Sequence, residues 1–151
     1  NDVGGGYGLS FYSGNHGNVR LPGSADTPRE ANGIFYVNSS IGLRDITDGS
    51  SNTLMVGERG LSSAAGIWPG VRQNQRENDV VTDCSDHTRI NSGITSFSST
   101  HGEGANFVFC DGAVRFISQS IESSPPGEGN MPRGTYQKLS QRNDSQQVSI
   151  D

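Results

Sequence analysis

Alternation of apolar and polar residues is clearest over residues 106–117, where two short runs flank an Asp-Gly pair. The runs cover 106–110 (Asn-Phe-Val-Phe-Cys) and 113–117 (Ala-Val-Arg-Phe-Ile), with Asp111-Gly112 between them. A period of two is typical of β-strands with one buried face. Asp-Gly between such runs indicates a type I′ turn, which needs positive φ at both central residues. The pattern therefore predicts a β-hairpin.

A two-residue turn also fixes which side chains meet across this hairpin. It places Phe109 opposite Val114 and Phe107 opposite Phe116. Side chains opposite each other share one face of the pair. We therefore expect these four residues to form a single aromatic face that is buried.

Other apolar runs predict extended segments elsewhere. Residues 34–37 are β-branched or aromatic and lie between Gly and Asn, which favours a strand. Residues 53–58 carry apolar side chains on both faces, as is typical of a central strand. Shorter strands are predicted at 80–84 and 94–98, and the Trp before Pro69 favours an extended segment.

Helix is predicted only in short pieces. Residues 43–49 supply one helical turn that a glycine ends, and Thr135 is a candidate N-cap for a helix over 136–142. Residues 1–33 read as loop with one short extended piece at 8–13. These elements predict an α+β fold, mainly antiparallel β-sheet, with long loops and little helix.

Composition limits the classes of protein that fit. The 151 residues allow one domain over 1–151, and we expect 1–9 and 143–151 to be flexible. Only 30% of residues are hydrophobic and 21 are glycine, which excludes a helix bundle or a long coiled coil. No apolar run reaches the roughly 20 residues of a membrane span. A net charge of −5 disfavours binding to the negatively charged backbone of a nucleic acid.

Cysteine usage and the ends bear on the compartment. Cys84 and Cys110 are the two cysteines, and no C-x-x-C motif is present. A disulfide between them and two buried free thiols are both consistent with the sequence. The Ser/Asn/Gly-rich, lysine-poor composition favours an extracytoplasmic location: periplasm, cell surface or secreted. Because the chain begins at Asn1 without a Met or signal peptide, we expect a piece of a longer product.

Several polar clusters are candidates for metal binding. Asp83, Asp86 and His87 lie within five residues and offer carboxylate and imidazole ligands, although a solvated loop has the same composition. Asp45 and Asp48 lie in an oxygen-rich turn that suits calcium, without the EF-hand spacing. Glu128 belongs to a second oxygen-rich segment, 122–130. Calcium is the metal these oxygen ligands favour, with zinc second.

Acid–base chemistry has one candidate pair. His101 lies at the open end of the predicted hairpin, near Glu122 on the returning chain. A histidine and a carboxylate in contact are able to exchange protons with a substrate. A structural hydrogen bond of His101 is the competing interpretation. Serine-nucleophile and phosphate-loop motifs are absent.

Two segments together resemble a known family. His101 is followed by nine residues and then Asp111-Gly112, and an upstream segment reads Arg-Asp-Ile-Thr-Asp48-Gly49-Ser-Ser-Asn52-Thr-Leu-Met-Val-Gly-Glu58. These segments resemble the H-x9-DG and "DITDGTSNT…GE" motifs of a bacterial family of prepilin-type proteins. The resemblance covers most of residues 10–140. The long hydrophobic N-terminal helix of that family is absent from this chain.

The resemblance implies a globular head like that of type II secretion pseudopilins and type IV pilins. Related pseudopilins bind calcium in a loop near the end of the sheet, which favours the 122–130 segment. The leading hypothesis is a structural or secretion-associated surface subunit that contacts other pilin-like subunits or an exported protein. It predicts an exposed apolar patch where such a helix packs, and weak self-association.

Two alternatives remain open. The first is a small metal-dependent hydrolase of an ester or lactone, with His101 and Glu122 as catalytic residues, because function is not fixed by fold. The second is a carbohydrate- or surface-binding module that uses Trp68, Tyr7 and Tyr12, if these rings cluster on one exposed face.

Overall fold

The structure is a computed structural model that describes residues 8–21, 31–60, 66–68, 80–125, 134–146, 148 and 150, with only the backbone described at 66–68. In chain order its elements are β1 (Gly8–Ser10), β2 (Tyr12–Gly17), the 3₁₀ turns η1 (Leu43–Asp45) and η2 (Ser50–Asn52), β3 (Leu54–Glu58), β4 (Gly66–Trp68), β5 (Val81–Asp83), β6 (Gly104–Phe109), β7 (Val114–Ser118) and α1 (Thr135–Ser140).

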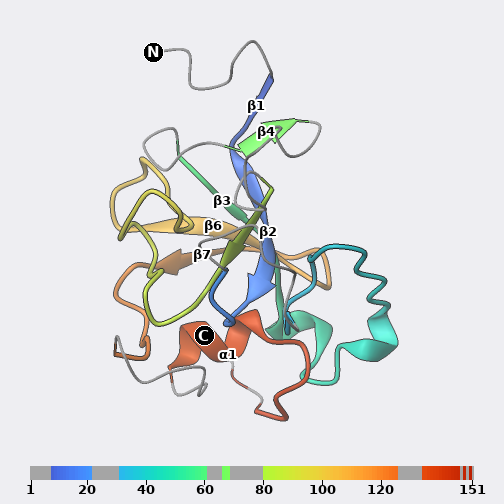
Figure 1. The fold of residues 1–151 in the computed structure, drawn as a ribbon. Helices are drawn as coiled ribbons and strands as arrows, with labels where there is room; N and C mark the ends of the chain where they lie inside the picture. Colours follow the sequence, from blue (N-terminus) through green and yellow to red (C-terminus); the bar gives the residue numbers. More distant parts are fainter. Residues whose placement is uncertain are drawn as a thin grey trace.

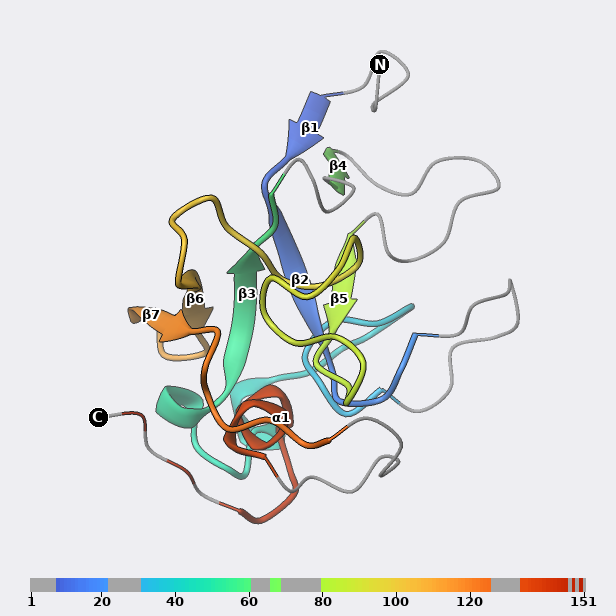
Figure 2. The same cartoon turned by 90° about the vertical axis from the view of Figure 1, so that its left-hand side faces the viewer.

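Five strands form the main sheet in the order β5-β2-β3-β6-β7 (Figure 2). All neighbours are antiparallel except β2 and β5, which are parallel. β1 and β4 form a separate two-stranded antiparallel ladder at the end of the molecule far from α1 (Figure 1). The predicted mainly-β α+β fold is confirmed, and the predicted central strand at 53–58 is β3. In the described part of the chain, no helix is long and apolar enough to cross a membrane.

The core lies on one face of this sheet. Leu54, Phe107 and Phe109 project from β3 and β6 and are almost completely buried. They pack against Tyr136 of α1 and against Phe97 of the loop before β6. The Phe97 and Phe107 rings meet edge to face at 5.1 Å between centroids, a favoured aromatic geometry. The same cluster includes Cys84, Ile90, Ala105, Ile117 and Leu139.

The hairpin forms where predicted, but its register is shifted by one residue. Val108 pairs with Val114, and Asn106 pairs with Phe116. Phe109 N donates to Ala113 O and Gly112 N donates to Phe109 O, and of the two turn residues only Gly112 has positive φ, at 86°. The connection is therefore a three-residue turn ended by a left-handed glycine, not a type I′ turn.

This shift changes which face the second strand presents. A slip of one residue moves every side chain of a strand to the opposite face. Ile117 joins the core instead of the outer face, and Arg115 lies over the Phe109 ring at 4.6 Å. Phe116 and Val114, predicted to be buried, are 50% and 66% exposed.

Two other predicted strands are wrong. Residues 34–37 form no ladder, because the amides of Ile34 and Phe35 both donate to the same carbonyl, that of Asn15. Residues 94–98 form a loop closed by Asn91 N donating to Phe97 O, which inserts the Phe97 ring into the core.

The predicted helix is shorter than expected and differently capped. α1 ends at Ser140, its N-cap residue is Gly134, and no side chain caps it. Thr135 instead donates from Oγ1 to Glu122 Oε2 at 2.9 Å. The predicted turn at 43–49 forms as η1 alone, over Leu43–Asp45.

Candidate functional site

The side of the main sheet opposite the core carries a set of partly exposed side chains that we call the open face. Three large ones are exposed: Tyr12 at 59%, Val114 at 66% and Phe116 at 50%. The complete set comprises Tyr12, Val56, Glu58, Asn106, Val108, Val114 and Phe116.

The open face is ordered by cross-strand pairing. Val56 of β3, Val108 of β6 and Val114 of β7 pair in succession and form a continuous aliphatic row. Directly opposed β-branched side chains contact one another across a sheet. At the β2 end the row meets Gly14, which pairs with Val56 and is covered by the Phe35 ring. The apolar part of the open face therefore spans β3, β6 and β7.

Glu58 places one carboxylate within this apolar face. Its Oε2 accepts from Asn106 N at 2.8 Å and its Oε1 accepts from Asn106 Nδ2 at 3.2 Å. Burial acts to raise the pKa of Glu58, but the bonds from Asn106 and Ser99 and the charge of His101 outweigh it, so the pKa lies below its usual value. The carboxylate is therefore ionised and fixed in position at neutral pH.

His101 lies beside this carboxylate. Its Nε2 lies 3.8 Å from Glu58 Oε1, and its side chain is 64% exposed. The sequence predicted Glu122 as the partner, but the Glu122 carboxylate is bonded to Thr135. The histidine and glutamate that the structure brings together are thus the first residue of the H-x9-DG segment and the last residue of the "DITDG" segment.

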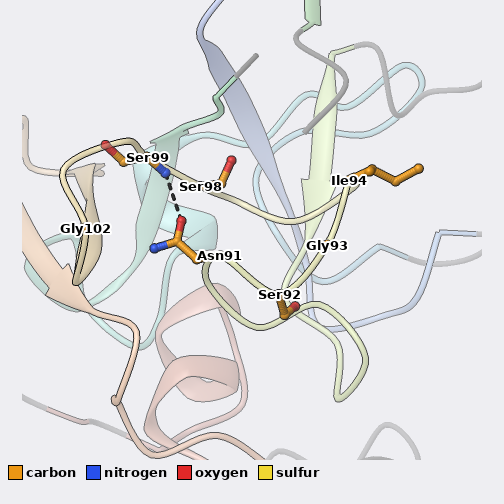
Figure 3. Close-up of a pocket in the computed structure, with 7 residues that line it drawn as sticks. All are labelled: Asn91, Ser92, Gly93, Ile94, Ser98, Ser99 and Gly102. Carbon is orange, nitrogen blue, oxygen red and sulfur yellow. Dashed lines mark hydrogen bonds between the residues drawn. The ribbon is translucent and has the colours of Figure 1, made fainter. Parts of the chain in front are cut away.

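A polar pocket of about 450 Å³ is lined in part by Ser99 and Gly102, which lie within two residues of His101 in the chain (Figure 3). Asn91 crosses it and accepts at Oδ1 from Ser99 N at 2.9 Å, while its Nδ2 donates to Gln119 Oε1. Its lining residues are Asn91, Ser92, Gly93, Ile94, Ser98, Ser99 and Gly102. Asn91 and Ser98 both bond within the protein, Asn91 Oδ1 accepting from Ser99 N and Ser98 Oγ accepting from Gly60 N.

The two motif segments meet again at the hairpin turn. Cys110 N donates to Thr53 O at 2.9 Å, and Asp111 N donates to Ser50 O at 3.1 Å. Asp111 Oδ1 accepts from Ala113 N within the turn. Together with the His101–Glu58 contact, these bonds hold β3 against β6 at both ends. The motif residues therefore fix the register of the central strands.

Gly49 and Asn52 complete the turn that receives the hairpin. Gly49 has a φ of 97°, which side chains rarely adopt, and its carbonyl accepts from Thr53 Oγ1 at 3.0 Å. Asn52 Nδ2 reaches the carbonyl of Asp48 at 3.5 Å. These residues shape the backbone, as turn-forming polar residues commonly do.

The carboxylates of Asp45 and Asp48 serve backbone groups. Asp45 Oδ2 accepts from Gly42 N at 2.8 Å. Asp48 is buried, and its oxygens accept from the amides of Asp144 and Ser145 at 2.7 and 2.9 Å. Asp144 and Ser145 lie in the segment for which we predicted flexibility. Each of the two carboxylates therefore holds backbone amides in place.

The predicted cluster of Asp83, Asp86 and His87 is divided between two sets of contacts. Asp83 is buried and accepts from Leu21 N, Ser85 N and Thr88 Oγ1. His87 Nε2 lies 3.6 Å from Asp86 Oδ1. Across the described ranges, no three His, Cys, Asp or Glu side chains form a group suited to a metal. Glu128 lies outside the described residues.

Both cysteines are free thiols, so the disulfide alternative is not realised. Cys84 is enclosed in the core, and burial raises its pKa to about 12. Cys110 lies in the hairpin turn, where burial and the charge of Asp111 raise its pKa to about 11. Raised pKa values leave both sulfurs protonated and poorly nucleophilic at neutral pH.

The open face was not recognised from sequence, although its residues were in view. The alternation at 113–117 is compatible with burial of either face, and only the turn decides between them. Tyr12 was considered with Tyr7 and Trp68 as a carbohydrate platform; the Tyr7 and Trp68 side chains lie outside the described part, and Tyr12 lies on the open face.

The fold and its site define a mainly-β α+β domain with one covered and one open sheet face. A family model described as "Protein of unknown function (DUF1559)" matches residues 1–124, and the chain belongs to that family. No curated protein and no solved structure matches the chain significantly.

Proposed function

We propose that the protein is a pilin-like structural subunit that acts outside the cytoplasm and packs its open face against an apolar helix of a pilin-like assembly. One observation carries the proposal: Val56, Val108 and Val114 form an aliphatic row across three strands, beside the exposed rings of Tyr12 and Phe116. Contiguous exposed apolar groups of this kind mark interaction surfaces.

The dimensions of the row favour a helix as its partner. Neighbouring strands lie about 4.8 Å apart, so a row from β3 to β7 is roughly 10 Å wide. An α-helix with its side chains is about 10 Å across. Because α1 already covers the core face of the sheet, a helix laid on the open face adds a third layer, an arrangement that domains adopt occasionally.

Glu58 adds a chemical requirement to this packing. A carboxylate that loses its water without gaining partners costs several kcal/mol. Asn106 already supplies two donors to it. We therefore expect the partner helix to bring a hydroxyl, amide or cationic group over Glu58.

Family membership and the resemblance of the two motif segments support the same function. The motif residues fix the pairing of β3 with β6, the two strands that carry the centre of the open face. The spacing of the motif residues is therefore explained by the shape of the docking surface and does not require a set of catalytic groups.

Photo-crosslinking in bacterial cells that express the complete gene product tests the proposal. A benzophenone amino acid is placed at Phe116 or Val114, with Leu43 as the matched control because it is 73% exposed and lies in η1. We expect crosslinks from the first two positions to an apolar helical segment, identified by mass spectrometry. Equal crosslinking from all three positions, or none above the control, contradicts the proposal.

A further inference from the structure

The two margins of the main sheet differ in their exposure. β5 forms one margin, and all of Val81–Asp83 is buried. β7 forms the other, with Val114 and Phe116 exposed, and no described segment runs along its outer side (Figure 2). β7 is thus the open edge of this sheet.

The register shows which backbone groups this edge presents. Ala113 O accepts a hydrogen bond from Phe109 N of β6. Gln119 N donates to the carbonyl of Glu103, the residue just before β6. In an antiparallel ladder such bonded positions alternate with positions whose N–H and C=O point away. Val114, Phe116 and Ser118 therefore direct their backbone groups outward. Within the described residues, only Ser118 O has a further backbone partner, Ile121 N.

β7 has no lysine, proline or bulge, three of the features that keep edge strands from pairing. Natural edges are protected by lysine, proline, a bulge or a covering segment. The five residues of β7 are Val-Arg-Phe-Ile-Ser, and they pair with β6 without a bulge. The single charged side chain, Arg115, lies over the Phe109 ring and not along the outer margin.

We propose that β7 pairs with β7 of a second copy of this chain, antiparallel and about a twofold axis at Phe116. Phe116 N–H then donates to Phe116 O of the second copy and the reverse. Ser118 N–H donates to Val114 O of the second copy, and the symmetric bond also forms. Each of these groups points outward in the structure.

The side chains of β7 are complementary to themselves in this register. Phe116 meets Phe116 of the second copy, and Val114 meets Ser118, all on the open face. On the core side Arg115 stands opposite Ile117, so no like charges are directly opposed. A register centred on Arg115 lacks this match, because it sets Arg115 directly opposite Arg115 of the second copy, and like charges directly opposed are destabilising.

The association uses little area and is weak. An interface of one short strand lies below the roughly 1,200 Å² of stable complexes, and two copies of net charge −5 repel each other. Added salt screens that repulsion and strengthens the dimer. The pairing uses the β7 edge and leaves the open faces of both copies side by side. The dimer proposal therefore does not depend on the function proposed above.

Cysteine crosslinking tests the register directly, in a Cys110→Ser background of the full chain. Two residues paired across a hydrogen-bonded antiparallel position have Cα atoms about 5.5 Å apart, which permits a disulfide. Phe116→Cys is therefore expected to form a disulfide-linked homodimer under mild oxidation. Val114→Cys is the matched control: its copies lie about 13 Å apart along the strands. Combining Val114→Cys with Ser118→Cys restores crosslinking.

The disulfide yields distinguish specific strand pairing from random encounters between exposed cysteines. A Phe116→Cys dimer yield at least about tenfold above that of Val114→Cys supports the proposed register. Equal yields, or a higher yield from the more exposed Val114→Cys, overturn it. An absence of crosslinks from Phe116→Cys at millimolar protein also overturns it.

A proline variant tests the backbone bonds without altering the apolar side chains. Ser118→Pro removes an outward N–H, a substitution that edge strands tolerate. Sedimentation velocity is expected to show a dimer dissociation constant raised about tenfold or more, since two bonds are lost per dimer. Ser118→Ala keeps the N–H and is expected to dimerise like the parent. If both variants dimerise equally, the edge does not pair. In cells, Ser118→Pro is expected to retain the photo-crosslinks to the apolar helical segment. Failure of the dimer and failure of the open-face proposal are therefore distinguishable.

Discussion

The two faces of the main sheet are built from the same strands but differ in what covers them. On the core face, Phe107 and Phe109 are buried beneath α1 and the loop before β6. On the open face, Phe116 of β7 is half exposed, although it follows directly after Arg115, the residue that pairs with Phe107. Both faces are apolar, so hydrophobicity alone does not identify the core. The difference in covering is the observation behind the docking role that we propose for the open face.

Truncation of one ring on each face gives the largest expected contrast. Phe107→Ala is expected to lower the free energy of unfolding by about 3–5 kcal/mol, because it leaves a cavity among Phe97, Gly57 and Tyr136. Phe116→Ala is expected to change it by less than about 1 kcal/mol. Urea denaturation measures both. Equal losses at the two positions remove the distinction between the faces.

The turn that assigns residues to the faces is tested next. Gly112→Val places a β-branched residue at a φ of 86° and is expected to cost about 1–2 kcal/mol of unfolding free energy. Gly112→Asn is the control and costs less, because Asn tolerates the left-handed region. Thermal and urea unfolding report the difference. If both variants are as stable as the parent, the turn is not of the observed type.

Glu58 gives the open face a dependence on pH. Its pKa is lowered in the folded chain, so its ionised form stabilises the fold above the ordinary pKa of a glutamate, about 4.3. This contribution is lost as the pH falls through the lower folded pKa.

Glu58→Gln therefore lowers stability at pH 7, and its difference from the parent vanishes toward pH 3. Urea titrations over that range measure the effect, with Glu103→Gln, at an exposed carboxylate, as the control. A difference that persists unchanged at pH 3 shows that the charge of Glu58 is not involved.

Calcium has the smallest expected effect on the described part of the fold. Asp45, Asp48 and Asp83 already bond to backbone amides. We expect calcium or a chelator to shift the midpoint of thermal unfolding by less than about 2 °C. A larger, saturable shift that Glu128→Gln abolishes places calcium in the 122–130 segment.

Local patterns predicted the positions of the central elements. β3 and the β6–β7 hairpin were visible because continuous and alternating apolar runs have direct counterparts in strands. The register was not predictable, because Asp-Gly is compatible with two turn types and Ser50 and Thr53, remote in sequence, hold the turn. Residues 34–37 have strand propensity that a bifurcated contact to Asn15 overrides.

The candidate site was predicted only in part. His101 and Glu58 were both in motifs, but their contact depends on how β3 pairs with β6, which spacing along the chain does not reveal. The bonds from Asp48 to the amides of Asp144 and Ser145 were not predictable, because carboxylates that accept amide bonds and those that bind metals share one residue type. Tyr12 was placed in an aromatic platform because its strand, β2, has a weak pattern of glycine and polar residues.

The central claim is that the open face docks a partner, and charge placed on that face tests it most directly. Val114→Glu and the control Leu43→Glu are compared in cells that express the complete gene product, after both are shown to unfold at the parent temperature when purified. We predict that Val114→Glu is lost from the sedimentable assembly while Leu43→Glu is retained, because a buried unpaired carboxylate disrupts an apolar interface. Retention of both variants at the parent level contradicts the account.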